Sequence, residues 1–335
     1  MKRGVNLGGW LVLEKWITPS VFGGYEAEDE YVLCKQLSAE AESILKIHRD
    51  NFITEADFKW IAEHGLDAVR LPLGYWIFGG EKPFVGGIEY VDKAFEWAKR
   101  YGLGILLDLH GAPGSQNGRD HSGKIGNINW NTLQNVSKSL EIIDRLASRY
   151  KGHNNLVGIE LLNEPVKISQ RRYLKDYYEH GYDLVRQYCG TEVCVVASDA
   201  FRPKRWGRIM QDSKYQNKQL DVHMYQLFTN ADKKLSLEGH IEKANHEWRK
   251  LIERVGKTWP VMIGEWSLAL DEPTLKGLSD DVKAAAMRAY GSVQLEVFEQ
   301  AASWFYWTYR TEGGGAWSYR HCVEHGWLPE KYTSV

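Results

Sequence analysis

The sequence predicts an α/β fold, a single (β/α)8 TIM barrel, from three observations. Eight apolar runs of strand length recur along the 335 residues, and most are separated by amphipathic stretches of helical period. Eight strand–helix units in about 300 residues are typical of this barrel. No Pro-, Gly- or Ser-rich linker divides the chain. We therefore predict one catalytic domain that spans residues 1–335.

The predicted strands lie far enough apart to leave room for helices between them. They are Arg3–Leu7, Ala68–Leu73, Gly104–Leu109, Val157–Leu162, Val193–Ser198, Leu220–Tyr225, Pro260–Glu265 and Ser303–Thr308. We expect helices over Thr54–His64, Tyr90–Arg100, Asn131–Tyr150, Tyr173–Tyr188 and Ser279–Gln300. The connection Thr18–Asn51 is long, and we expect it to be a mixed loop and helical insertion.

Two of these helices carry further signals. Thr54 and Asp57 match an N-terminal capping box for the first helix, and Gly65 marks its end. The last helix is expected to turn one apolar face toward the core, formed by Val282, Ala285, Ala286, Ala289, Val293 and Val297.

Composition and charge limit the possible partners. A formal net charge of −2 gives no reason to expect nucleic acid or an anionic membrane surface. No apolar run reaches the length of about 18 residues needed to span a membrane, and the first ten residues resemble a strand rather than a signal peptide. We expect a cytoplasmic monomer, or a secreted one if a leader was removed. The cysteines show no Cys-x-x-Cys spacing and are expected to be free thiols.

Polar or aromatic residues recur near the same end of six predicted strands. They are Arg70, His110, Asn163, Glu164, His223, Tyr225, Glu265 and Trp307. Each of them alone could be a core residue or a buried ion-pair partner, and Asn163-Glu164-Pro165 alone could be a polar loop start. In a barrel, however, the carboxyl ends of all strands meet at one mouth, where the chemistry of such proteins takes place.

Two carboxyl groups in this set point to a reaction. Hydrolysis of a glycosidic bond needs one carboxylic acid to protonate the leaving oxygen and one carboxylate to attack or to activate water. Glu164 and Glu265 are the candidates. Arg70 and Tyr225 are suitable donors to keep Glu265 ionised, and we expect Glu164, near a second carboxylate, to stay protonated at neutral pH. The 14 Trp and 18 Tyr add flat faces that can stack on sugar rings.

Other classes of protein fit less well. A metal hydrolase would need clustered histidines, but His110 and His223 are far apart and no His-x-His occurs. A phosphate site could use Gly313–Gly315, which has only Arg310 as a basic neighbour. A non-catalytic sugar-binding barrel would keep the aromatic residues but would not need both glutamates.

An ordered set of motifs resembles the exo-β-1,3-glucanases of glycoside hydrolase family 5 (cellulase family A). The matching segments are Arg3–Glu14, Trp16–Ser20, Arg70–Pro72, Gly74–Trp76, Asp108–Gly118, Asn163–Pro165, His223–Tyr225 and Ile263–Ser267. The resemblance implies a retaining mechanism with Glu164 as acid/base and Glu265 as nucleophile. It implies no metal or organic cofactor and a β-glucan or β-glucoside as substrate. The supporting residues would be Arg70, His110, Asn163, His223, Tyr225 and Trp307.

The resemblance also leaves the preferred substrate open. It implies that Glu14 contacts the terminal sugar, and a carboxylate there would close the cleft, so that glucose is released from non-reducing ends. A β-glucosidase that acts on aryl or disaccharide glucosides and an endo-β-1,4-glucanase are the alternatives. The resembling fungal proteins clamp the leaving sugar between two Phe residues. Phe228 matches the second, but Arg119 replaces the first, and in Asp120-His121 the His stands where Asn is usual.

Overall fold

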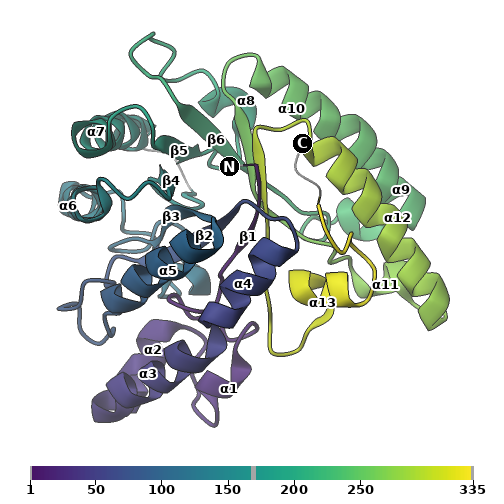
Figure 1. Ribbon diagram of the computed structural model, residues 1–335, viewed down its shortest axis with the longest axis horizontal. Helices are drawn as coiled ribbons and strands as arrows, with labels where there is room; N and C mark the ends of the chain where they lie inside the picture. Colours follow the sequence, from purple (N-terminus) through teal and green to yellow (C-terminus); the bar gives the residue numbers. More distant parts are fainter. Residues whose placement is uncertain (1, 167–170, 333–335) are drawn as a thin grey trace.

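Eight parallel strands close into a barrel in chain order, with β8 paired to β1, which confirms the predicted (β/α)8 fold (Figure 1). The computed structural model describes residues 2–166 and 171–332, without the side chains of residues 171 and 172. The strands are β1 Arg3–Asn6, β2 Ala68–Gly74, β3 Gly104–Gly111, β4 Leu156–Glu160, β5 Cys194–Ser198, β6 Lys218–Met224, β7 Val261–Trp266 and β8 Ser303–Tyr306. All eight predicted strands are present.

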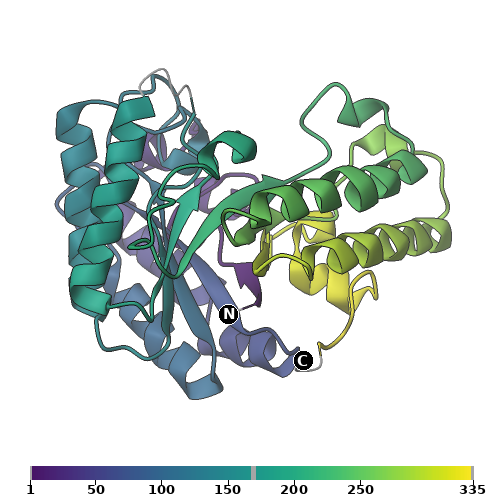
Figure 2. The same ribbon diagram turned by 90° about the horizontal axis from the view of Figure 1, so that it is seen from above.

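Helices surround the barrel. Figures 1 and 2 show α6 and α7 side by side at one flank, and α9, α10 and α12 together at another. The helices are α1 Pro19–Phe22, α2 Glu30–Leu37, α3 Ala41–Phe52, α4 Glu55–Glu63, α5 Ile88–Tyr101, α6 Leu133–Tyr150, α7 Arg171–Cys189, α8 Pro203–Trp206, α9 Leu237–Lys243, α10 Arg249–Gly256, α11 Glu272–Leu275, α12 Asp280–Phe298 and α13 Tyr319–Glu324. The five predicted helices correspond to α4, α5, α6, α7 and α12.

The signals at the ends of α4 are confirmed. The Asp57 side chain accepts hydrogen bonds from the backbone N–H and the hydroxyl of Thr54, and the capping box is complete. Gly65 follows the helix with a φ of 76°, a left-handed conformation that glycine adopts without steric cost.

The predicted core face of α12 is wrong in part. Ala286 and Val297 are buried, but Val282 is 50% exposed and Ala285 and Ala289 also face solvent. The face toward the barrel is formed by larger residues, among them Met287, Tyr290, Gln294 and Phe298. Because an aromatic side chain buries far more apolar area than alanine, Tyr290 and Phe298 decide how the helix is rotated.

The insertion before α4 forms a small core of its own and holds the loop after β1. Leu13, Phe22, Leu33 and Leu45 are among its buried residues. The buried carboxylate of Glu30 accepts hydrogen bonds from the Leu13 backbone N–H at 2.8 Å and from Trp76 Nε1 at 3.1 Å. The predicted mixed insertion is therefore confirmed, and it fixes the segment that carries Glu14.

The inside of the barrel changes from apolar to charged along the strand direction. A lower layer contains Ala68, Leu106, Cys194, Val196, Met262 and Phe305. Two residues further along, where side chains again point inward, stand Arg70 on β2 and Asp108 on β3, both fully buried. This charged layer lies directly beneath the carboxyl ends of the strands. All four cysteines are free, and no helix among the described residues is long and apolar enough to cross a membrane.

Candidate active site

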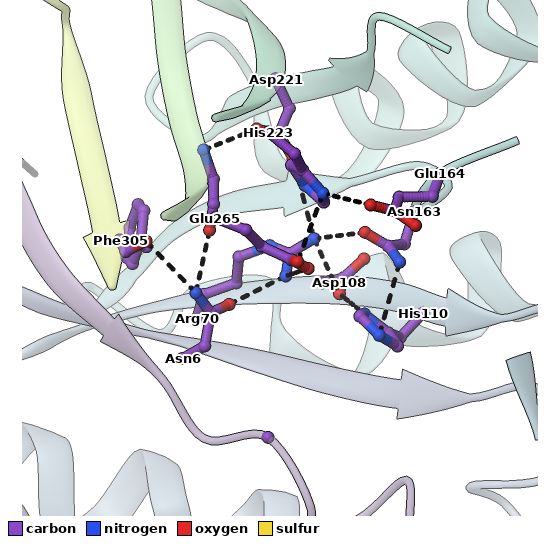
Figure 3. Close-up of polar contacts among 12 residues, drawn as sticks. Asn6, Arg70, Asp108, His110, Asn163, Glu164, Asp221, His223, Glu265 and Phe305 are labelled. Atoms are coloured by element: carbon purple, nitrogen blue, oxygen red, sulfur yellow. Dashed lines mark hydrogen bonds and ion pairs between the residues drawn. The ribbon is translucent and has the colours of Figure 1, made fainter. Parts of the chain in front are cut away.

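A cavity of about 450 Å³ opens at the carboxyl ends of the strands and collects most of the predicted site residues. It is lined by Glu14, Trp16, His110, Arg119, Asp120, His121, Glu164, Tyr225, Phe228, Glu265, Trp307 and Trp317. The remaining predicted residues, Arg70, Asn163 and His223, lie beneath this lining and contact it (Figure 3). Of the lining residues, only Trp16 and Trp317 were not predicted.

Arg70 stands at the centre of the polar network below the cavity (Figure 3). Its guanidinium donates to Asn6 Oδ1 at 2.8 Å, to Asn163 Oδ1 at 2.9 Å and to Glu265 Oε1 at 3.2 Å. On its other edge it donates to Glu160 Oε2 at 2.8 Å. One side chain from β2 thus holds groups on or just after β1, β4 and β7.

The buried partners Asp108, Glu160 and Asp221 were missed by the sequence analysis. Each lies inside a strand and is fully buried, and Asp108 Oδ2 is 3.1 Å from Arg70. Burial would lower the pKa of Arg70, but these carboxylates raise it well above its usual value. Burial also raises the pKa of Glu160 well above its usual range, despite Arg70. The sequence signal that could have identified them is a charged residue within a strand that is buried on both faces.

Glu164 follows β4 in a left-handed conformation, with a φ of 43°. This region costs a residue with a side chain about 1–3 kcal/mol, and such strain is concentrated at functional sites. The following Pro165 disfavours the right-handed helical region for Glu164. The strained backbone directs the carboxyl group toward His223, whose Nδ1 lies 2.7 Å from Glu164 Oε1.

His223 lies between carboxyl groups on both of its edges (Figure 3). Its Nδ1 is also 3.3 Å from Glu265 Oε2, and its Nε2 is 3.0 Å from Asp221 Oδ2. Burial would lower the pKa of His223, but the charges of Glu265 and Asp221 raise it well above its usual value. With carboxylates at both nitrogens, the ring is an imidazolium that donates from both.

The prediction that Glu164 stays protonated at neutral pH is wrong for this structure. Burial would raise its pKa, but the hydrogen bond and the charge of His223 hold it well below the usual range. The prediction took only the second carboxylate into account as a neighbour of Glu164. It did not foresee that a protonated histidine would lie between the two.

Glu265 receives the two predicted donors. Tyr225 donates its hydroxyl to Oε2 at 2.8 Å, and Arg70 donates to Oε1 at 3.2 Å. Burial raises the pKa of Glu265, and the charges of His223 and Arg70 offset only part of this effect. The two donors favour the ionised form of Glu265 over the protonated form, and they fix the direction of its carboxylate oxygens.

One wall of the cavity is formed by His110 and Trp307, whose rings are parallel, with centroids 5.3 Å apart. His110 Nδ1 is 2.7 Å from Asp108 Oδ2, and its Nε2 lies 3.4 Å from the Asn163 amide. This second-layer contact with Asp108 sets the orientation of the imidazole.

The segment after β1 closes one side of the cavity. Glu14 is buried and accepts a hydrogen bond from Trp16 Nε1 at 2.8 Å. Trp16 in turn contacts Trp317, with ring centroids 5.1 Å apart. Burial, together with the charge of Asp120, raises the pKa of Glu14 well above its usual range. Neither Lys15 nor Lys2 pairs with Glu14, because Lys15 binds Glu28 and Lys2 binds Glu299.

The other rim of the cavity comes from loops. Phe228 is 64% exposed and lies near Trp317 and Tyr225. Arg119 is exposed, and no carboxylate in the described part of the chain lies within ion-pair distance of its guanidinium. A turn of three residues, Asp120–Ser122, places His121 Nε2 at 3.4 Å from Glu164 Oε2.

Among the described residues, the group of side chains that could hold a metal ion consists of Glu164, His223 and Glu265. One ligand atom each from Glu164, His223 and Glu265 lies within 4.8 Å of the others. His223, however, uses both ring nitrogens as donors to carboxylates, and an imidazolium has no lone pair for a metal ion. The arrangement fits acid–base chemistry between carboxyl groups better than metal binding.

A closed parallel barrel with two carboxyl groups at its mouth has the pair of groups that a glycoside hydrolase uses. More specifically, the chain belongs to glycosyl hydrolase family 5, because the model "Cellulase (glycosyl hydrolase family 5)" matches residues 33–313. It is 37% identical to "Probable glucan 1,3-beta-glucosidase A" of Emericella nidulans, over 99% of this chain and 90% of that protein. It is 36% identical to "Glucan 1,3-beta-glucosidase" of Blumeria graminis, over 99% of this chain and 87% of that protein.

Solved structures share the fold at lower sequence identity. The rutinosidase from Aspergillus niger has a TM-score of 0.83 and 22% identity, with 97% of each chain covered. The endoglucanase Cel5A from Thermotoga maritima has a TM-score of 0.59 and 15% identity, over 95% of this chain and 91% of that one. These likenesses concern the barrel alone.

Replacing Arg70 by Met tests the central network. The change leaves Asp108, Glu160 and Asp221 buried without their cation, so we expect a loss of about 3–5 kcal/mol in unfolding free energy at pH 7. Arg70 lowers the pKa values of Glu160 and Asp221, so these values would rise in the folded variant, and the loss should shrink as the pH falls and the two groups become protonated. Denaturant unfolding at pH 7 and pH 5 measures both effects.

Arg100→Met is the matched control, because Arg100 forms an exposed pair with Glu55. It should leave the unfolding transition unchanged. If the two variants were equally stable, the buried network would not be what holds these strand ends in place.

Proposed function

We propose that the protein is a retaining exo-β-1,3-glucanase that releases glucose from the non-reducing ends of β-glucans. The observation that carries this proposal is the Glu164–Glu265 pair, joined by His223 at the base of a cavity that Glu14 closes on one side. The names of the two fungal relatives support the β-1,3 linkage. The carboxyl spacing supports retention, because oxygens within 4.8 Å are too close for the roughly 6.5–9.5 Å gap of inverting enzymes.

In the first step Glu265 attacks the anomeric carbon while Glu164 delivers a proton to the leaving oxygen. Glu164 and His223 hold one proton between them across 2.7 Å, and the pair titrates as a unit. Positive charge that develops on the sugar neutralises Glu265, which is the largest charge that keeps His223 protonated. The proton then passes from His223 to Glu164 and on to the leaving group.

In the second step water attacks the glycosyl–Glu265 ester. Glu164 is now a carboxylate and takes a proton from this water, and His223 can recover it across the same contact. Each cycle thus returns the proton that it used. Arg70 and Tyr225 hold the Glu265 oxygens in line for attack and stabilise the carboxylate when it leaves.

The exo mode of action depends on the closed side of the cavity. Glu14 is buried and bonded to Trp16, so it occupies the place where an endo-acting cleft would let the chain continue. As an acceptor it can bind the hydroxyl groups of a terminal sugar, which are free only at a chain end. The parallel rings of His110 and Trp307 would form the wall beside this sugar.

A β-glucosidase that acts on aryl or disaccharide glucosides is the second candidate. It is favoured by the leaving-group side, where Arg119 replaces an aromatic residue and Phe228 and Trp317 leave exposed ring faces. Initial rates on laminarin, lichenan, carboxymethyl cellulose and aryl β-glucosides separate these functions. The single catalytic domain, the monomer, the cytoplasmic location and the lack of a nucleic-acid or membrane partner stay predictions, and light scattering would test the monomer.

The roles of the two glutamates can be separated with azide. Glu265→Ala should abolish turnover, and azide should not restore a retained product, because the nucleophile is missing. Glu164→Ala should accumulate the glycosyl–enzyme, and azide should convert it to a β-glycosyl azide. Proton NMR of the first product is the measurement. An α-configured first product from the unaltered enzyme would contradict retention.

Glu14→Gln tests the closed end of the cavity. It keeps the size of the side chain but weakens the hydrogen bonds to the terminal sugar. At a pH at which Glu14 is ionised, we expect a loss of about 1.5–3 kcal/mol in transition-state binding, read from kcat/KM on laminari-oligosaccharides. The unaltered enzyme should release glucose with little early fall in polymer viscosity. Rapid loss of viscosity and a ladder of oligosaccharides would instead mean an open cleft.

Arg119→Phe tests the leaving-group side. A guanidinium can hydrogen-bond hydroxyl groups as well as stack on a ring, so it should tolerate varied leaving groups. We expect the Phe variant to favour laminari-oligosaccharides over aryl β-glucosides by several-fold in the ratio of kcat/KM values. An unchanged ratio would mean that Arg119 takes no part in binding the leaving group.

A further inference from the structure

The Glu164 carboxyl group contacts two histidines, one on each oxygen. His223 Nδ1 lies 2.7 Å from Oε1, and His121 Nε2 lies 3.4 Å from Oε2. The first contact is an ordinary charge-assisted hydrogen bond. The second is longer than a typical N–H···O hydrogen bond, but it is close enough for a direct electrostatic effect.

The two histidines differ in charge. His223 is held as an imidazolium by Glu265 and by Asp221 on its far edge. The titratable and charged groups that face His121 are Glu164, His110, Asp120 and Arg119. The ring centroids of His121 and His110 are 5.4 Å apart. Burial lowers the pKa of His121 to about 4, and its neighbours do not reverse this. At neutral pH the ring is therefore uncharged and carries one N–H.

The surroundings of the ring decide which nitrogen holds that hydrogen. His121 Nδ1 is buried and has no hydrogen-bond partner among the described residues. A buried N–H without a partner is rarer and more costly than an unpartnered acceptor. The hydrogen therefore belongs on Nε2, the nitrogen that faces the carboxylate.

We propose that His121 is a positioning residue for the general acid, whose neutral Nε2–H supports the Oε2 atom of ionised Glu164 and so makes Glu164 a stronger acid. This inference rests on the proposed acid/base role of Glu164. A stronger acid transfers its proton more completely to a leaving oxygen in the transition state. The effect should matter most for sugars and alkyl groups, which leave poorly without a proton.

His121→Phe removes the nitrogen and keeps a ring against His110. Because the variant loses a donor to the ionised form of Glu164, the proton that Glu164 and His223 share is held more tightly. The alkaline limb of the kcat/KM profile, which reports loss of this shared proton, should move up by about half to one pH unit. The value of kcat/KM should fall about three- to tenfold for a laminari-oligosaccharide and stay unchanged for 2,4-dinitrophenyl β-glucoside, whose leaving group needs no proton. His121→Gln, which keeps an N–H donor, should lie between the two proteins.

A double-mutant cycle separates positioning from direct sugar binding. In the Glu164→Ala background, adding His121→Phe should leave kcat/KM on 2,4-dinitrophenyl β-glucoside unchanged, because the group through which His121 acts is gone. Equal losses on both substrates in the single variant, or an alkaline limb that stays in place or moves down, would overturn the proposal. His246→Gln, at an exposed surface histidine, is the control for handling, and thermal melts check that each variant is folded.

Two outcomes distinguish a failure of the acid/base role of Glu164 from a failure of the role of His121. If Glu164→Ala itself hydrolysed laminari-oligosaccharides at the normal rate, the proposed acid/base role would fail. If Glu164→Ala lost that activity as expected but His121→Phe behaved as the unaltered enzyme, only the role of His121 would fail.

Discussion

The arrangement of the catalytic groups depends on one buried cation. Arg70 joins Asn6, Asp108, Glu160, Asn163 and Glu265, which stand on or just after four different strands. Replacing a buried ion pair by apolar residues is often neutral or stabilising, so stability alone does not explain such a network. Its geometric effect is clearer, because the guanidinium presents donors in fixed directions. Arg70 thereby sets the position of Glu265 and, through Asn163, the start of the turn that carries Glu164. Gly264 also helps to fix the network. A Cβ at this position would lie 2.2 Å from Asp221 Oδ1, which instead accepts a hydrogen bond from the Gly264 N–H at 2.7 Å.

In the proposed reaction, His223 distributes the proton between the two glutamates. Two carboxyl groups so close together would normally differ in pKa because one charge disfavours the other. Here a shared imidazolium stabilises both carboxylates, so the three groups titrate together. The roles then follow from what each glutamate contacts. Glu265 has fixed donors in Arg70 and Tyr225, which suits a nucleophile, whereas Glu164 has a partner that can itself release a proton. The proposed acid and the proposed nucleophile are thus distinguished by their partners rather than by their resting pKa values.

Most of the barrel could be predicted from the sequence, because strand and helix periods are local and the closed sheet brings strand ends together whatever the loops do. The same reasoning placed Glu164, Glu265, Arg70 and Tyr225 at one mouth. It could not place His223 between the two glutamates. That contact depends on an irregularity in register between β6 and β7, which sets His223 opposite Glu265. Trp317 was missed because it lies in a loop after β8 whose path depends on tertiary contacts with Trp16.

The two sides of the cavity are built differently, and this difference bears on how specificity can change. The side that would hold the terminal sugar comes from strand ends and from the insertion that fixes Glu14, so it is rigid. The leaving-group side comes from loops that carry Arg119, Phe228 and Trp317. Loops accept substitutions without moving the strands that hold the carboxyl pair. Arg119 directly precedes the turn Asp120–Ser122, which carries His121, and His121 contacts Glu164. A change in this short segment therefore bears on both proposed roles, which are the binding of the leaving group by Arg119 and the acid strength of Glu164.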